Sequence, residues 1–502
     1  MANMNKIADA PSNKPINNRK RILFRCASVL FAIALIAVAE SFLRFAGIGV
    51  PQDLGDPFVG FHEIHPLFEI NEDKTRYEIP ESRRRFFRPE SFAAQKDKKE
   101  FRIFCLGGST VQGRPYAIET SFTSWLELSL KAADPERTWE SVNCGGVSYA
   151  SYRLVPILKE ILNYSPDLII VYTGHNEFLE ERSYQTTKRT PQWMMAVHER
   201  ISRLHCYELL RATWRKNDDT AIKPDLAAEV DALLDFQGGL EKYKRDEQWH
   251  RGVVDHFEHN LRRMIRIANA ADVPIMLANP VSNLRDSPPF KSVVDESLSD
   301  EERRQFNKLW EKAKNSEWTN LDDKLQLVKS VLEIDDRFPD AHFLLAKIYE
   351  AQDDIVNAKA AYIRAKDLDI CPLRIVSELQ NAIGVVADQT GTPLVDIKQQ
   401  FEEMEEDGIP GDKTLIDHVH PRIDGHQQIA EAFLREMVRR KLVRLSEGWK
   451  ARQQELYKQR FATLEPAYFP QSVERLRGLK RWAEGRVRRI RGDSSDEQPH
   501  QV

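Results

Sequence analysis

Cysteine is scarce in this chain. The five cysteines among 502 residues are odd in number and widely scattered, which excludes a fold built on a framework of disulfides. We expect most of these thiols to be buried as small apolar side chains. Ligand spacings typical of a metal site are also missing, because His250, His256 and His259 fall on one predicted helix as surface or core residues. The sequence therefore predicts no metal and no cofactor.

An excess of charge of one sign is missing too. Lys and Arg number 73 and Asp and Glu number 77, which gives a formal net charge of −4 at pH 7. Proteins that bind nucleic acid usually carry a basic excess, so this balance predicts no nucleic-acid partner. The hydrophobic content of 41% is ample for a large core, and a chain of 502 residues corresponds to roughly two to four domains.

The apolar run near the N-terminus, Cys26–Ala39, is shorter than the roughly 20 residues of a standard membrane span. Further apolar residues extend it to 22–45, and residues 1–25 hold six Lys or Arg against one acid. This bias predicts a cytoplasmic basic tail over 1–21, with the rest of the chain extracytoplasmic, in the periplasm or at the cell surface. Because Ala37-Val38-Ala39 fits a signal-peptide cleavage site, a cleaved signal stays open beside the membrane anchor that we favour.

Three short polar segments, Gly107–Thr110, Gly174–Glu177 and Asp417–His420, carry most of the functional information. The first two directly follow apolar, β-rich runs, so their polar residues should lie at the carboxyl edge of one sheet. Each segment alone is more simply a turn or a helix cap. In this order, with a serine in the first and an Asp-x-x-His pattern in the third, they predict one serine-hydrolase site.

The chemistry of nucleophilic catalysis explains these residue types. A Ser hydroxyl is a poor nucleophile until a base takes its proton, so Ser109 needs His420 within hydrogen-bond reach. Asp417, three residues before His420, would hold the imidazole in one tautomer and stabilise its cation. Ser109 also lies between tight glycines and a predicted helix start, where backbone N–H groups can stabilise an oxyanion.

This combination resembles the SGNH (GDSL-like) hydrolase superfamily, whose sequence blocks contribute Ser, Gly, Asn and His. The resemblance implies that Ser109 is the nucleophile, that Asp417 and His420 complete the triad, and that the Asn176 amide donates to the oxyanion. The α/β-hydrolase alternative needs a Gly-x-Ser-x-Gly pattern, and Val111 stands where its last glycine would be.

The chain departs from the superfamily at the second block, where a glycine normally supplies a backbone N–H. Its spacing places Ser148 at that position, with Gly146 shortly before it. The resemblance therefore implies that an N–H near Gly146 and Ser148 joins the Ser109 N–H and the Asn176 side chain in the oxyanion hole. A milder departure is Glu177, where the superfamily usually has Asp.

Predicted strands and helices alternate along the chain, which is typical of a parallel sheet covered by helices on both faces. With the resemblance, this predicts an α/β fold with a three-layer αβα, flavodoxin-like SGNH core over residues 100–440, interrupted by helical insertions. The predicted strands are 101–106, 139–143, 168–173, 274–278 and 393–396, and the predicted helices are 121–133, 151–163, 252–271, 373–389 and 425–440.

Further segments flank or interrupt this core. Residues 46–99 are predicted as an irregular lead-in, and residues 178–249 as a helical lid or wall over the site. Residues 290–371 resemble a tetratricopeptide unit by the spacing of small and large apolar residues, with an ordinary helical hairpin as the alternative. Residues 441–502 are predicted as basic helices and a disordered tail. Within them, 475–491 are expected to form either a basic amphipathic helix that touches anionic lipid or polymer, or a solvated charged helix.

The predicted activity is that of an anchored, extracytoplasmic serine esterase, which removes O-acyl groups from a glycan or lipid through an acyl-enzyme. An O-acyltransferase that passes the acyl group to a carbohydrate hydroxyl would use the same triad. A third possibility is an assembly protein that binds a protein partner through residues 290–371 on a hydrolase scaffold. A scaffold has no need of Ser109, Asn176, Asp417 and His420 together, which favours an enzyme.

Overall fold

The structure is a computed structural model, and it describes residues 18–46, 48, 66–180, 201, 204–207, 209, 230, 232–235 and 238–483. The chain divides into two compact units. One comprises residues 1–55 and 185–223, and the other comprises residues 56–184 and 224–502. Most of the predicted lid, 178–249, lies outside the described residues, as do the basic tail over 1–17 and the C-terminal residues 484–502.

The described part of the first unit consists mainly of helix α1 (Asn18–Ala46). Its segment Cys26–Ala46 has a mean hydropathy of 2.3 and is long and apolar enough to cross a membrane. Both a membrane anchor and a signal sequence satisfy this criterion of length and composition, so the two predictions stay open.

The second unit is built on a five-stranded parallel sheet with the strand order β5-β4-β6-β7-β8. This order is that of flavodoxin-like folds, and it confirms the predicted fold class and all five predicted strands. The central strand β6 and its neighbour β7 are buried along their whole length, as the unbroken apolar runs required. The strands are β4 (Glu100–Gly107), β5 (Thr138–Gly145), β6 (Leu168–Tyr172), β7 (Ile275–Asn279) and β8 (Leu394–Asp396).

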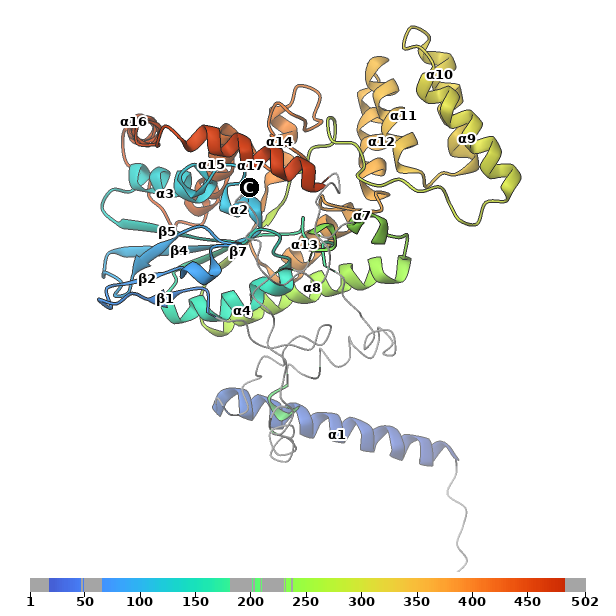
Figure 1. The fold of residues 1–502 in the computed structure, drawn as a ribbon. Coiled ribbons are helices and arrows are strands. Elements are labelled where there is room, and N and C mark those ends of the chain that lie inside the picture. Colours follow the sequence, from blue (N-terminus) through green and yellow to red (C-terminus); the bar gives the residue numbers. More distant parts are fainter. Residues whose placement is uncertain are drawn as a thin grey trace, which may run out of the picture. The chain divides into compact units, whose positions relative to one another are not determined.

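Helices cover both faces of this sheet and produce three layers (Figure 1). One face carries α4 (Ser151–Ile161), α8 (Glu247–Ala270) and α13 (Ser377–Thr390). The other carries α3 (Phe122–Ala133), α14 (Ile397–Met404), α15 (Ile423–Arg439) and α16 (Trp449–Ala462). Aromatic and aliphatic side chains between this second helix layer and the sheet form one part of the core, with Trp125 and Phe433 among them.

The lead-in segment is more regular than the sequence predicted. It contains a small antiparallel sheet of β1 (Glu69–Ile70), β2 (Arg76–Glu78) and β3 (Ser91–Ala93), with the helical turn η1 (Glu81–Arg83). These strands have two or three residues each, too few to show an alternating pattern.

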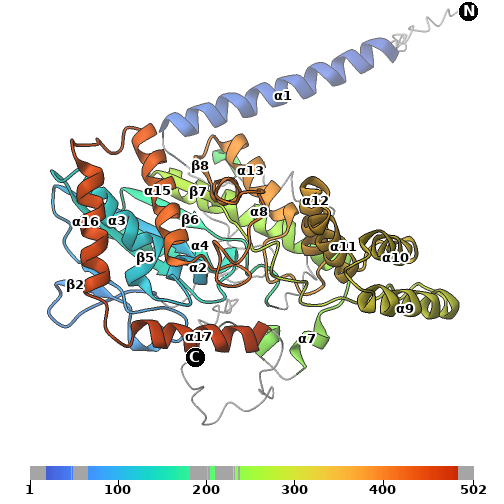
Figure 2. The same ribbon diagram turned by 90° about the horizontal axis from the view of Figure 1, so that it is seen from above.

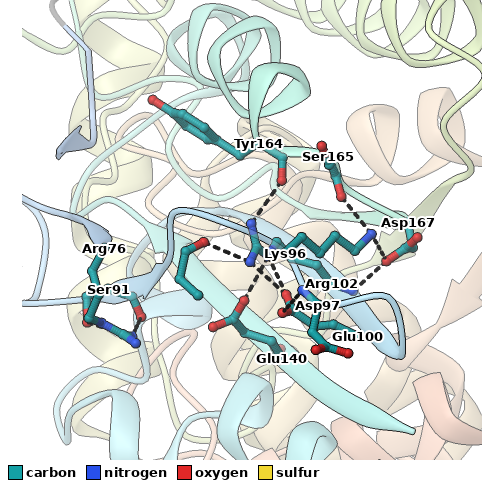
Figure 3. A network of polar contacts seen from close by, with 12 residues as sticks. Arg76, Ser91, Lys96, Asp97, Glu100, Arg102, Glu140, Tyr164, Ser165 and Asp167 are labelled. Carbon is teal, nitrogen blue, oxygen red and sulfur yellow. Dashed lines mark hydrogen bonds and ion pairs between the residues drawn. The ribbon is translucent and has the colours of Figure 1, made fainter. Parts of the chain in front are cut away.

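Arg102 of β4 joins this small sheet to the large one (Figure 3). The side chain is only 1% exposed and bonds to the Glu100 and Glu140 carboxylates and to the Ala93 carbonyl oxygen of β3. Beside it, Lys96 forms an ion pair with Asp167. A buried guanidinium that binds two carboxylates and a carbonyl satisfies its donors locally, so the lead-in is fastened to the core.

Four helices follow β7: α9 (Asp300–Asn315), α10 (Leu321–Ile334), α11 (Pro339–Ala351) and α12 (Ile355–Asp367). Each packs against the next, and they lie side by side in Figure 2. Ala346, Ala358 and Tyr362 are buried where α11 meets α12. The four helices form a helical insertion, as expected, whereas their membership of the tetratricopeptide class stays a prediction.

The C-terminal helices pack on the core. Helix α17 (Tyr468–Ala483) places the Tyr468 hydroxyl 2.7 Å from Thr120 Oγ1, and Arg475 Nε donates to the Pro115 carbonyl at 2.6 Å. The described part of the predicted basic helix therefore has one face buried against the segment that follows Ser109. Contact of its other face with anionic lipid or polymer stays a prediction. The remaining short elements are η2 (Ile118–Thr120), η3 (Leu162–Tyr164), η5 (Leu233–Asp235) and α7 (Gly239–Lys242).

Candidate active site

Ser109 stands at the carboxyl edge of the sheet, where β4 ends at Gly107 and the short helix α2 (Ser109–Gln112) begins. Both preceding glycines are required by close contacts. A Cβ on Gly107 would lie 2.1 Å from the Tyr172 carbonyl oxygen, and one on Gly108 would lie 2.5 Å from Asn176 Nδ2. The Gly-Gly pair thus lets the end of β6 and the Asn176 side chain approach the turn that holds Ser109.

Ser109, His420 and Asp417 form one hydrogen-bonded chain. Ser109 Oγ lies 2.7 Å from His420 Nε2, and His420 Nδ1 lies 2.7 Å from Asp417 Oδ2. The second oxygen of Asp417 accepts from the backbone N–H groups of Val419 and His420 at 2.9 and 2.8 Å. Three residues that the sequence placed in two distant segments are therefore brought together with the spacing needed for proton transfer.

Asp417 is buried but charged. Burial alone would raise its pKa, yet His420 and His418, with the hydrogen bonds from His420 and Val419, hold the pKa of Asp417 well below its usual value. A carboxylate that stays ionised can orient the His420 ring and stabilise an imidazolium there.

Three further histidines surround His420 and are neutral. Burial, followed by the charges of nearby histidines, lowers the pKa of His175 to about 3, and burial lowers that of His418 to about 4 and that of His426 to about 3. Of these four histidines, His420 is the one placed within hydrogen-bond distance of both Ser109 Oγ and Asp417 Oδ2.

The structure distinguishes between the predicted oxyanion donors Gly146 and Ser148 by the hydrogen bonds that their N–H groups make. The Gly146 N–H donates to the Gly107 carbonyl at 3.0 Å, so Gly146 is not an available donor, and that prediction is corrected. Among the described residues, the Ser148 N–H has no hydrogen-bond partner, and Ser148 has a φ of 62°, a left-handed conformation that glycine adopts easily. Glycine would adopt this conformation with less strain than Ser148.

Asn176 approaches from the end of β6. Its Nδ2 donates to the Tyr149 carbonyl at 3.0 Å, which orients the amide and leaves its second N–H for another acceptor. The neighbouring Glu177 is fully buried and accepts from the backbone N–H and hydroxyl of Ser151 at 2.7 and 3.0 Å. Glu177 thereby caps α4 and fixes the turn that presents Asn176.

Several supporting residues were not predicted from the sequence. The Asn283 backbone N–H donates to the His418 carbonyl at 3.0 Å, and its side chain donates to the Asp417 carbonyl at 3.3 Å. The buried Arg374 in turn donates to the Asn283 carbonyl at 2.8 Å. These contacts stabilise the loop of Asp417 and His420, and they come from segments more than 40 residues away. No local sequence pattern could therefore have predicted them.

Within the residues that the structure describes, no group of three or more His, Cys, Asp or Glu side chains has a geometry suited to a metal ion. The described cysteines are free thiols, and Cys105, Cys144 and Cys371 are buried. At this edge of the sheet the structure brings together Ser109, His420 and Asp417.

Comparison with known proteins finds similarity only to solved structures. No family model matches the chain, and no curated protein matches it. A lipolytic protein of the G-D-S-L family from Desulfitobacterium hafniense matches with a TM-score of 0.30 and 11% identity, over 66% of this chain and 98% of that one. A lipase/acylhydrolase from Enterococcus faecalis matches with 0.32 and 12%, over 69% and 100%. The acetylxylan esterase Axe2 from Geobacillus stearothermophilus matches with 0.31 and 14%, over 68% and 96%.

Proposed function

We propose that this protein is a serine esterase that removes acyl groups from an O-acylated glycan or lipid. The observation that carries this proposal is the chain of hydrogen-bond distances from Ser109 Oγ through His420 to Asp417. The α1 helix, with its basic N-terminal flank, supports an extracytoplasmic enzyme held at a membrane. No cofactor takes part in the proposed reaction.

The first half-reaction forms an ester with the enzyme. Ser109 Oγ attacks the carbonyl carbon of the substrate ester while His420 Nε2 takes the hydroxyl proton. The resulting oxyanion accepts hydrogen bonds from the N–H groups of Ser109 and Ser148 and from Asn176 Nδ2. The C–O bond to the alcohol then breaks, and the alcohol leaves with the proton from His420, so that the acyl group remains on Ser109.

Water completes the cycle. His420 takes a proton from water, the hydroxide attacks the acyl carbonyl, and the second oxyanion collapses to a carboxylic acid. Ser109 regains its proton from His420, so the enzyme is unchanged at the end. Asp417 stays ionised throughout and stabilises the imidazolium in both halves.

Hydrolysis of 4-nitrophenyl acetate by the full-length chain in detergent tests this function. We expect turnover by the wild type, with kcat lower by at least about 1,000-fold in the Ser109→Ala variant. A fluorophosphonate probe should label the wild type and not Ser109→Ala. The exposed Ser297→Ala serves as the matched control and should behave as the wild type. A folded wild type that shows neither turnover nor labelling would refute the proposal.

A further inference from the structure

A cavity of about 550 Å³ lies between the core and the helical insertion α9–α12. Core residues from the segment after Asn176, from the start of α8 and from residues 370–378 form one wall, and Arg337, Arg364 and Asp367 of the insertion form the other. Pockets that bind small ligands usually have volumes of about 300–1,000 Å³, so this one is large enough for several sugar rings or a comparable group.

The floor of the cavity is apolar and aromatic. Phe178, Pro372 and Val376 are buried beneath it, and the ring of Phe178 meets that of Trp249 edge to face at 5.4 Å. Phe178 also packs at 5.0 Å against His250. Trp249 is partly exposed, so its ring is the aromatic surface of the cavity that can accept the C–H face of a sugar ring.

The rim of the cavity is charged but nearly balanced in sign, with Lys and Arg side chains facing a similar number of carboxylates. Some of these groups pair across the rim: His250 Nε2 lies 2.6 Å from Glu378, and Arg337 forms an ion pair with Glu247. In the described structure, Lys244 and Arg364 have no hydrogen-bond or ion-pair partner and are exposed. A balanced rim provides donors and acceptors without attracting a polyanion.

Two chain segments connect the cavity to the candidate active site. Phe178 is the second residue after Asn176, and the two belong to one turn in which the Leu179 N–H donates to the Asn176 carbonyl at 3.3 Å. On the other side, the backbone N–H of Ile375, next to Val376, donates to His175 Nδ1 at 3.2 Å. A ligand in the cavity would therefore lie beside the same turn that presents the oxyanion donor.

We propose that this cavity binds uncharged sugar residues of the substrate, next to the sugar whose acyl group reaches Ser109. The partly exposed ring of Trp249 stacks on the C–H face of a sugar, and the charged rim bonds to the sugar hydroxyls. A lipid tail offers no acceptor to Lys244 and Arg364, the two rim cations without a partner in the described structure, and would partly desolvate them. The inference rests on the proposed esterase function and narrows its substrate from glycan or lipid to a neutral glycan.

Binding without turnover is the first test. Full-length Ser109→Ala in detergent is titrated by calorimetry with xylotetraose, cellotetraose, mannotetraose and chitotetraose. We expect at least one of these oligosaccharides to bind, and the added substitution Trp249→Ala to weaken that binding at least tenfold. Trp318→Ala is the matched control, because Trp318 is an exposed tryptophan of the helical insertion that does not line the cavity.

Selectivity is the second test. For the wild type, kcat/KM is measured on the O-acetylated form of the bound oligosaccharide and on 4-nitrophenyl acetate. The kcat/KM for the oligosaccharide divided by that for 4-nitrophenyl acetate should fall at least tenfold in Trp249→Ala, mainly because KM for the oligosaccharide rises. This ratio should not change in Trp318→Ala. A fall of both activities by the same factor would show that Trp249 has only a structural role and would overturn the inference.

The remaining outcomes are also decisive. The inference is overturned if none of the four oligosaccharides binds, if binding is indifferent to Trp249→Ala, or if phosphatidylcholine vesicles compete with the sugar for the cavity. Failure of the proposed function looks different, since the wild type would then hydrolyse no 4-nitrophenyl acetate while oligosaccharide binding could still be measured.

Discussion

At the scale of single residues, the site depends on how one short loop uses a carboxylate. Asp417 Oδ1 accepts from two N–H groups of its own loop, and Oδ2 lies 2.7 Å from His420 Nδ1. With the Asp-x-x-His spacing, the Asp417 carboxylate therefore stabilises the backbone of its own loop and also orients the His420 imidazole. A change of the carboxylate should disturb the tautomer of His420 more than the fold.

Asp417→Asn tests this role directly. An amide can place an N–H against His420 Nδ1 and so favour the wrong tautomer, and we expect kcat for 4-nitrophenyl acetate to fall about 10⁴-fold. Thermal unfolding monitored by circular dichroism reports whether the fold persists. Asp388→Asn, at the exposed end of α13, is the control and should retain full activity. Activity within tenfold of the wild type in Asp417→Asn would rule out the proposed triad.

Ser148 has a strained backbone conformation at a position where the proposed mechanism needs only a backbone N–H. Its φ of 62° is strained for a residue with a Cβ, whereas its backbone N–H is the group that the mechanism uses. Ser148→Gly should relieve the strain and increase the free energy of unfolding by about 0.5–1 kcal/mol, as measured by urea denaturation.

The same variant should keep its activity, because glycine supplies the same N–H. Ser148→Ala is the companion variant, which keeps the strain and removes only the hydroxyl. If either variant lost more than tenfold in kcat, the Ser148 hydroxyl rather than its N–H would be the functional group.

At the scale of elements, the site depends on the junctions between strands and helices. β4 leads into α2 at Ser109, and β6 leads into the turn of Asn176, which Glu177 joins to the start of α4. Because the strands are parallel and adjacent, their carboxyl ends meet at one edge and bring these turns together. The buried carboxylate of Glu177 is thus a support for both α4 and the oxyanion donor.

Glu177→Ala should affect stability and catalysis together. The Ser151 N–H would lose its acceptor, which should reduce the free energy of unfolding by about 1–3 kcal/mol. The shift of the Asn176 turn should also lower kcat on 4-nitrophenyl acetate by at least about tenfold. Urea denaturation and steady-state kinetics measure the two effects. A variant that loses stability but keeps the kcat of the wild type would show that Glu177 does not position Asn176.

At the scale of the whole molecule, the Arg102 network joins the lead-in to the core and places two carboxylates against one guanidinium (Figure 3). Glu100 and Glu140 share the guanidinium of Arg102. Burial, followed by the nearby Glu100, raises the pKa of Glu140 to about 7. A carboxyl group with a raised pKa in the folded state contributes its full stability below its unfolded pKa, and that contribution is lost as the pH rises towards 7.

Glu140→Gln should therefore flatten the dependence of stability on pH. Between pH 5 and pH 8 we expect the free energy of unfolding of the wild type to fall relative to the variant by about 1–2 kcal/mol, after allowance for partial solvent exposure. Urea denaturation at four pH values across this range provides the measurement. Parallel curves for the two proteins would mean that Glu140 titrates at the same pH in the folded and unfolded states.

The sequence by itself determined the strands of the sheet and the residues of the candidate triad. Apolar runs such as 101–106 and 168–173 are local signals, and a parallel sheet necessarily gathers the polar residues that follow them at one edge. The placement of Ser109 and Asn176 at one edge could therefore be predicted before any contact was known, whereas His420 was predicted from the Asp-x-x-His pattern. Their catalytic roles stay a proposal until the variants are measured.

Only the tertiary structure decided how these groups are supported. The Gly146 N–H is occupied by a hydrogen bond to the Gly107 carbonyl. The ring of His175 is oriented by a hydrogen bond from the backbone N–H of Ile375, 200 residues away. The small β1–β3 sheet depends on Arg102, and α17 depends on Pro115 and Thr120. Such hydrogen bonds join segments that are distant in the sequence, and their partners leave no periodic pattern, so they are determined by the packed fold rather than by local sequence.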